Sequence, residues 1–155
     1  MRVLVIEDSA RKLSNLVEFV KEVTKDAKVT QKRSYSNGLE SALDESFDLI
    51  LLDMSLPFYD VTADNPSSDT LVYAGRDILR ELQRMKKDCN VVVVTQFPEF
   101  GEGAEKVTLD ELTEDLGRSF TENYLGTIYY HPSKLDWQQG IINIIEHLGF
   151  GVRND

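Results

Sequence analysis

The sequence predicts an α/β protein built on a parallel, five-stranded sheet with helices on both faces. Short apolar runs such as VLVI (3–6), LILL (49–52) and VVVV (91–94) are typical of strands buried on both faces. Between these runs, apolar residues recur at helical spacing. A strand followed by a helix therefore repeats five times along the chain, which favours a parallel arrangement.

Each element follows from a local signal. Ser9 can cap the first helix, and the spacing from Thr108 to Glu111 is that of a capping box. The run 28–35 is polar, which favours an edge strand. We expect strands at 3–6, 28–35, 47–53, 91–95 and 126–130, and helices after Ser9, at 36–45, at 74–86, from Thr108 and at 135–148. This order corresponds to the doubly wound, flavodoxin-like class.

Two connecting segments are unusually long. Residues 54–73 and 96–108 are rich in Asp, Pro, Ser, Gly and Glu, and we expect both to be irregular loops. Loops longer than about 12 to 15 residues are uncommon in compact domains and tend to be functional. We therefore expect the segments 57–73 and 96–108 to form a lid or a partner surface.

Composition indicates one acidic, globular domain spanning 1–155, with no output domain. The 155 residues include 17 Lys and Arg against 27 Asp and Glu, a net charge of −10, and no basic tract. This argues against binding to nucleic acid or to an anionic membrane. The single Cys89 predicts a reducing compartment, and neither a signal peptide nor a membrane-spanning run is evident. We expect a cytoplasmic protein.

Polar residues gather where the predicted strands end. Glu7 and Asp8 follow the first strand, Asp53 ends the third, Thr95 ends the fourth and His131 follows the fifth. In open parallel sheets the ligands bind beyond these carboxyl ends. Three converging carboxylates repel one another unless a cation joins them, and an all-oxygen ligand set favours Mg²⁺. Alone, each acid could simply be a helix-start or strand-end residue.

The chain resembles the receiver domain of bacterial two-component response regulators. The acidic pair in VLVIEDS, the D-x-x-x-P of DMSLP, the threonine of VVVVT and the late YYHP carry the resemblance, in one order along nearly the whole chain. It implies that Asp53 accepts the phosphoryl group as an aspartyl phosphate. It also implies that Glu7, Asp8, Asp53 and the backbone carbonyl of Ser55 hold Mg²⁺, and that Thr95 donates its hydroxyl to a phosphoryl oxygen.

The chain departs from the family at two positions, one on the fifth predicted strand and one just after it. His131 stands where the family usually has a lysine directly before proline, a long charged arm that reaches the phosphate. As His⁺ it could still donate a hydrogen bond, and Lys134 is a further candidate, although we expect it to face away. Ile128 stands where the family often has an aromatic switch residue, with Tyr129 and Tyr130 following as surface and core neighbours.

The leading hypothesis is a stand-alone receiver, a phosphoprotein that signals through protein contacts and is not an enzyme. A sensor histidine kinase or phosphotransfer protein is the implied donor. The output protein is unknown, and the surface around helix four could form a homodimer. A phosphorylation-independent pseudo-receiver keeps the fold without the chemistry. A metal-dependent phosphotransferase or nuclease is a third reading, disfavoured because Asp53-Met54-Ser55 lacks a second acid and the chain is acidic.

Overall fold

The computed structural model describes residues 1–153 and confirms the doubly wound parallel sheet. The strand order is β2-β1-β3-β6-β9, with all pairs parallel. These strands are β1 (Arg2–Ile6), β2 (Lys28–Lys32), β3 (Leu49–Leu52), β6 (Val91–Thr95) and β9 (Tyr124–Tyr129). The helices are α1 (Ala10–Val23), α2 (Tyr35–Asp44), α3 (Ala74–Arg84), α4 (Leu109–Ser119) and α5 (Asp136–His147).

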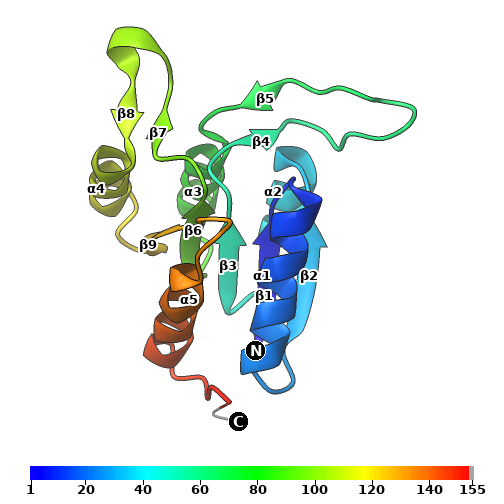
Figure 1. Ribbon diagram of the computed structural model, residues 1–155, viewed down its shortest axis with the longest axis vertical. Coiled ribbons are helices and arrows are strands. Elements are labelled where there is room, and N and C mark those ends of the chain that lie inside the picture. The colour runs from blue at the N-terminus through cyan, green and yellow to red at the C-terminus, as the bar shows by residue number, and fades with distance from the viewer. Residues whose placement is uncertain (154–155) are drawn as a thin grey trace.

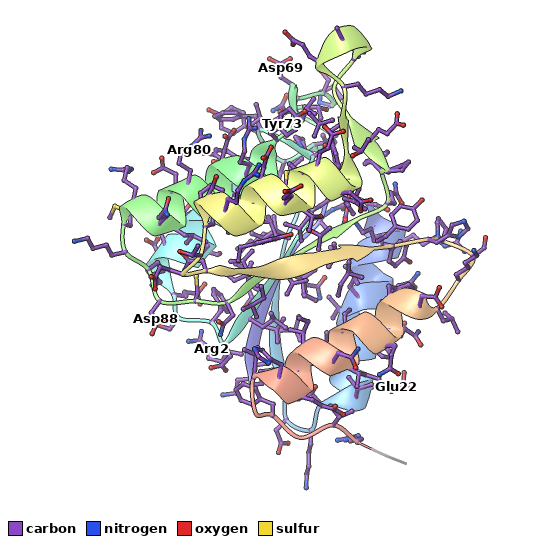
Figure 2. The ribbon with its side chains drawn as sticks, turned by 90° about the vertical axis from the view of Figure 1, so that its left-hand side faces the viewer. Arg2, Glu22, Asp69, Tyr73, Arg80 and Asp88 are labelled. Atoms are coloured by element: carbon purple, nitrogen blue, oxygen red, sulfur yellow. The ribbon has the colours of Figure 1, made fainter. Side chains whose placement is uncertain are left out.

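The helices cover the two faces of the sheet and enclose two cores. α1 and α5 pack on one face, and α2, α3 and α4 pack on the other (Figure 1). Figure 2 shows the edge strand β9 running between α4 and α5, so the three layers are seen from the side. The central strands β1, β3 and β6 contribute alternate side chains to each core, because successive residues point to opposite faces. Their unbroken apolar runs follow from this burial on both sides.

Several local predictions are confirmed. Ser9 Oγ accepts a hydrogen bond from Lys12 N at 3.4 Å, and Thr108 Oγ1 accepts one from Glu111 N at 3.2 Å, so both residues cap their helices. β2 lies at the edge of the sheet, as its polar sequence predicts. The side chain of Tyr129 is exposed and that of Tyr130 is buried, as expected for neighbours on a strand.

The prediction that both long loops are irregular is wrong in one respect, because each loop contains a β-hairpin. The first hairpin pairs β4 (Leu56–Pro57) with β5 (Thr70–Leu71), and the second pairs β7 (Glu99–Phe100) with β8 (Val107–Thr108), both antiparallel. A short 3₁₀ helix, η1 (Gly103–Glu105), forms the tip of the second hairpin. Two-residue strands have no detectable sequence period, so the turn-rich composition concealed them. Both hairpins project beyond the same end of the sheet (Figure 1).

Aromatic contacts join the hairpins to the body of the protein. The rings of Tyr35 and Phe58 have centroids 5.5 Å apart, and Ser36 N donates to Phe58 O at 3.0 Å, so the first hairpin is fixed to the start of α2. The ring centroid of Tyr73 lies 6.2 Å from that of the buried Phe100 in the second hairpin. Figure 2 labels Tyr73 at the end of the molecule that carries the hairpins. Within residues 1–153, no helix combines the length and apolar character needed to cross a membrane.

Candidate acidic site at the carboxyl edge of the sheet

The strand register brings Glu7 and Asp53 together. Ile6 pairs with Leu52 across the central strands β1 and β3, so the residues that follow them leave the sheet side by side. Asp53 N donates to Ile6 O at 3.0 Å, which continues the ladder by one more bond. The carboxylates therefore meet because two apolar runs of matching length stop at the same level.

Three carboxylates form the centre of the site. One oxygen each from Glu7, Asp8 and Asp53 lies within 4.8 Å of the others. Glu7 and Asp53 are buried, whereas Asp8 is exposed at the mouth of the site. This is the set predicted from the sequence, and its mixed burial gives the cluster one side open to solvent.

A lysine enters the same cluster from α1. The side chain of Lys12 is only 2% exposed, and its Nζ lies 2.5 Å from Glu7 Oε1 and 3.6 Å from Asp53 Oδ2. Nζ also donates a hydrogen bond to Val94 O of β6 at 2.7 Å. The ring of Tyr130 lies 5.6 Å from the ammonium nitrogen. A charged group this deeply buried requires such partners, because an unpaired buried charge is strongly unfavourable.

Burial and mutual repulsion set the acidities. Burial raises the pKa of Glu7, and the neighbouring charge of Asp53 adds to the increase, while Lys12 opposes it. Burial also raises the pKa of Asp53, against the lowering effect of Lys12. Partial burial, with Glu7 beside it, raises the pKa of Asp8 to about 6. The cluster therefore favours protonation, or a cation, more than isolated carboxylates do.

Backbone groups orient two of the carboxylates. Glu7 Oε2 accepts a hydrogen bond from Ser9 N at 3.0 Å, and Asp53 Oδ1 accepts one from Met54 N at 2.8 Å. The start of α3 lies directly behind Asp53, because a Cβ atom on Gly75 would come within 2.9 Å of Asp53 O. Gly75 N donates to Met54 O at 2.9 Å. The absence of a side chain at position 75 lets the helix approach the strand end this closely.

The other predicted site residues lie around this centre with different orientations. Thr95 is fully buried at the end of β6, and its Oγ1 accepts a hydrogen bond from Phe97 N at 3.2 Å. Ser55 Oγ donates to Val72 O at 2.7 Å and so faces the first hairpin. His131 Nδ1 accepts from Ser133 N at 3.1 Å, and its ring lies 6.4 Å from that of Tyr129.

The histidine is not part of the cluster in this structure. His131 lines a cavity between β9 and α5 together with Ile128, Trp137 and Gly140. Among the described residues, no hydrogen bond or ion pair connects it to Glu7, Asp8 or Asp53. Lys134 is exposed, as expected. Neither candidate from the fifth-strand loop thus supplies a cation to the acidic site.

Sequence reasoning missed Lys12, although a signal was present. Lys12 lies four residues before Leu16, on the helical stripe that continues through Phe19 and Val23. A lysine on the buried face of a helix is unusual and indicates a buried acidic partner. The apolar residues of this helix predict its buried face, and the lysine on that face is a separate signal for a buried acidic partner.

The first hairpin borders the cluster on the side of Asp8. A cavity of about 280 Å³ lies between them, lined by Asp8, Arg33, Asp60 and Ser67 among others. Arg33 Nη2 donates to Asp8 O at 2.7 Å, which holds a guanidinium at the mouth of the site.

Two curated relatives align with nearly the whole chain, and one of them is named as a response regulatory protein. An uncharacterized protein, y4jR, of Sinorhizobium fredii is 28% identical over 144 residues, which cover 92% of this chain and 95% of that protein. The Detocs response regulatory protein DtcB of Enterobacter cloacae is 25% identical over 150 residues, covering 96% of this chain and all of that protein. No protein-family model matches the sequence.

Solved structures with the same fold are receiver proteins. The response regulator TrrA of Thermotoga maritima, in complex with Mg²⁺ and BeF, superposes with a TM-score of 0.62 at 16% identity, covering 95% of this chain and 97% of that one. The phosphorylated cyanobacterial phytochrome response regulator RcpA gives a TM-score of 0.65 at 19% identity, covering 95% and 92%. The chain has the CheY-like fold of response regulator receiver domains.

Proposed function

We propose that the chain is a receiver that accepts a phosphoryl group on Asp53 and passes the signal on through protein contacts. The observation that carries the proposal is the convergence of Glu7, Asp8 and Asp53 within 4.8 Å at the carboxyl edge of the sheet. In open α/β sheets this edge is where ligands bind. Structures of the same fold, one in complex with Mg²⁺ and BeF and one of a phosphorylated protein, support this assignment.

The residues present fit a magnesium ion. The three carboxylates offer only oxygen donors, and with Lys12 they carry two net negative charges when all are ionised. Glu7 Oε1 lies 2.5 Å from Lys12 Nζ, and Glu7 Oε2 accepts a hydrogen bond from Ser9 N. Asp8 and Asp53 would therefore hold the ion most directly, with the backbone carbonyl of Ser55 as the family resemblance implies. When bound, Mg²⁺ would neutralise charge on the phosphoryl oxygens.

Residues of the site have separate roles in phosphoryl transfer. One carboxylate oxygen of Asp53 forms a bond to phosphorus while the bond from phosphorus to the donor breaks, and the donor leaves with that electron pair. Met54 N holds Oδ1 of Asp53 in position. The Thr95 hydroxyl, at the end of the adjacent strand β6, accepts a hydrogen bond from Phe97 N and retains its own proton to donate to a phosphoryl oxygen. Hydrolysis reverses the state, because water attacks phosphorus and releases inorganic phosphate from Asp53.

The partners follow from this chemistry. A sensor histidine kinase or phosphotransfer protein supplies the phosphoryl group, and an output protein recognises the phosphorylated surface, as two-component signalling requires. The homodimer remains an alternative form of output. We expect the exchange to take place in the cytoplasm.

Acetyl phosphate with Mg²⁺ tests the assignment directly. The purified chain is expected to gain the mass of one phosphoryl group in intact mass spectrometry, and Asp53→Asn is expected to gain none. Asp77→Asn provides a matched control, because Asp77 lies on α3 and, within residues 1–153, forms an ion pair with Arg80 alone. Equal labelling of the wild-type and Asp53→Asn proteins, or no labelling of either, would remove the assignment.

A phosphorylation-independent interaction module is the second candidate. The observation that favours it is Lys12, which already neutralises part of the acidic cluster without any ligand. This reading expects Asp53→Asn to leave partner binding and biological output unchanged. The receiver reading expects that substitution to abolish the response to the donor kinase.

A further inference from the structure

We propose that Lys12 of α1 is the phosphoryl-binding cation of this receiver and replaces the lysine that is absent from the loop after β9. The inference rests on the proposed function, because it names a residue that acts on the phosphoryl group of Asp53. Three observations support it: the contacts of the ammonium group, its supporting environment and the placement of His131.

The contacts place the ammonium at the site of transfer. Nζ of Lys12 lies 3.6 Å from Asp53 Oδ2, whereas Glu7 Oε1 and Val94 O lie at 2.5 and 2.7 Å. An ammonium group has three donors. The ammonium donates to Val94 O and lies at ion-pair distance from Glu7 Oε1, while Asp53 Oδ2 at 3.6 Å is too far for a hydrogen bond from its remaining donor. A phosphoryl oxygen on Asp53 would provide the acceptor that this donor lacks.

The environment holds the ammonium in place. Lys12 is the third residue of α1, and Ser9 caps the helix by accepting from Lys12 N itself. The Tyr130 ring covers the ammonium at 5.6 Å, and Asn15 Nδ2 donates to the Tyr130 hydroxyl at 2.8 Å. Residues from α1, from β6 and from the position just after β9 thus fix the lysine, so little reorganisation is needed when charge develops on the phosphoryl oxygens.

The loop after β9 does not supply an alternative cation. His131 accepts from Ser133 N and lines the cavity against α5, and Lys134 is exposed. Receivers of the resembling family place a lysine at the position of His131. In this protein the buried Lys12 enters the acidic site from α1 instead, and it provides the same positive charge.

The arrangement also couples the phosphoryl group to β6. Lys12 donates to Val94 O, one residue before Thr95. A shift of the ammonium toward a phosphorylated Asp53 would weaken this bond at the same strand end that Thr95 occupies. The lysine and the threonine would then respond to the phosphoryl group together.

Rescue by a relocated lysine tests the proposal. Lys12→Met is expected to slow phosphorylation by acetyl phosphate about a hundredfold in saturating Mg²⁺, because one preorganised charge at the transferring group is lost. Lys12→Met combined with His131→Lys is expected to recover at least about tenfold of that loss. Lys134→Met, which removes an exposed lysine near His131, is the control and should match the wild type. Near-ultraviolet circular dichroism confirms that each variant is folded.

The outcomes separate this inference from the proposed function. No labelling of the wild type overturns both. A labelled wild type with a Lys12→Met rate within about twofold of it overturns only the role of Lys12. A slow Lys12→Met protein that His131→Lys does not rescue overturns the replacement.

A measurement on the wild type is independent of the folding of the variant. Beryllofluoride with Mg²⁺ mimics the phosphoryl group, and its binding should shift the side-chain nitrogen resonance of Lys12 but not that of Lys134. An unchanged Lys12 resonance with beryllofluoride bound overturns the proposal.

Discussion

Lys12 and Glu7 form a buried ion pair, with Lys12 Nζ 2.5 Å from Glu7 Oε1 and both side chains 2% exposed. The pair joins α1 to the end of β1, and the nearby Asp53 extends it to β3. The site therefore contains a cation of its own before any metal or phosphoryl group arrives. The stability of the site and the pKa values of its carboxyl groups depend on their burial and on this balance of charges.

Lys12→Met should destabilise the metal-free protein strongly. Removing one partner from a buried ion pair leaves uncompensated charge on Glu7 and Asp53 and typically costs about 3 to 5 kcal/mol. Urea denaturation at neutral pH in EDTA measures the free energy of unfolding. Lys21→Met, on an exposed position of the same helix, should change it by less than about 0.5 kcal/mol. Equal stability of the two variants would contradict the importance of the pair.

Asp53→Asn should stabilise the metal-free protein at neutral pH. Burial raises the pKa of Asp53, so the folded protein holds this proton more tightly than the unfolded chain does. The stability that this difference provides is complete below the unfolded-state pKa and is lost as the pH rises through the folded-state pKa. The neutral amide avoids this loss and can keep the bond from Met54 N. Urea denaturation in EDTA should give the variant a larger free energy of unfolding than the wild type at about pH 7.5. The difference should vanish below about pH 4. An Asp53→Asn variant that is less stable than the wild type at neutral pH would contradict this prediction.

Magnesium affinity should rise with pH across the titration of Asp8. The pKa of this carboxyl is raised to about 6 in the metal-free protein, and a metal ligand must be deprotonated. Calorimetric titration between about pH 5 and pH 7 should show the affinity rising by up to about tenfold per pH unit for each proton released. The slope should flatten above about pH 7 and decrease in Asp8→Asn. A flat profile in the wild type would exclude Asp8 as a ligand that must lose a proton.

Gly75→Ala should destabilise the protein and disturb Asp53. The added Cβ would lie 2.9 Å from Asp53 O and 3.1 Å from Met54 Cα, so the start of α3 must move away from the strand end. We expect a loss of about 1 to 3 kcal/mol and slower phosphorylation. Gly117→Ala is the matched control, because nothing lies within 4 Å of its Cβ on α4. There the gain in helix propensity should stabilise by about 0.5 to 1 kcal/mol. Similar effects at both positions would argue against the close approach.

The five βα units and the acidic residues at the strand ends were evident in the local pattern. Unbroken apolar runs such as 49–52 and 91–94 specify strands buried on both faces, and helical spacing specifies the elements that cover them. Parallel strands place their carboxyl ends at one edge, so the meeting of Glu7, Asp8 and Asp53 follows from connectivity alone. These features depend on residues close in sequence and on one rule of topology.

The hairpins, the orientation of His131 and the role of Lys12 depend instead on contacts between distant parts of the chain. The strands of each hairpin are two residues long and are held by aromatic contacts to other elements, as between Phe58 and Tyr35. Lys12 finds its partners at positions 7, 53 and 94, which three different strands bring together. A charge at a core-facing helical position indicates that a partner exists. Only the packing of α1 against the sheet determines which residues provide it, because a buried charge is satisfied by whatever lies within a few ångströms in space and not by its neighbours in sequence.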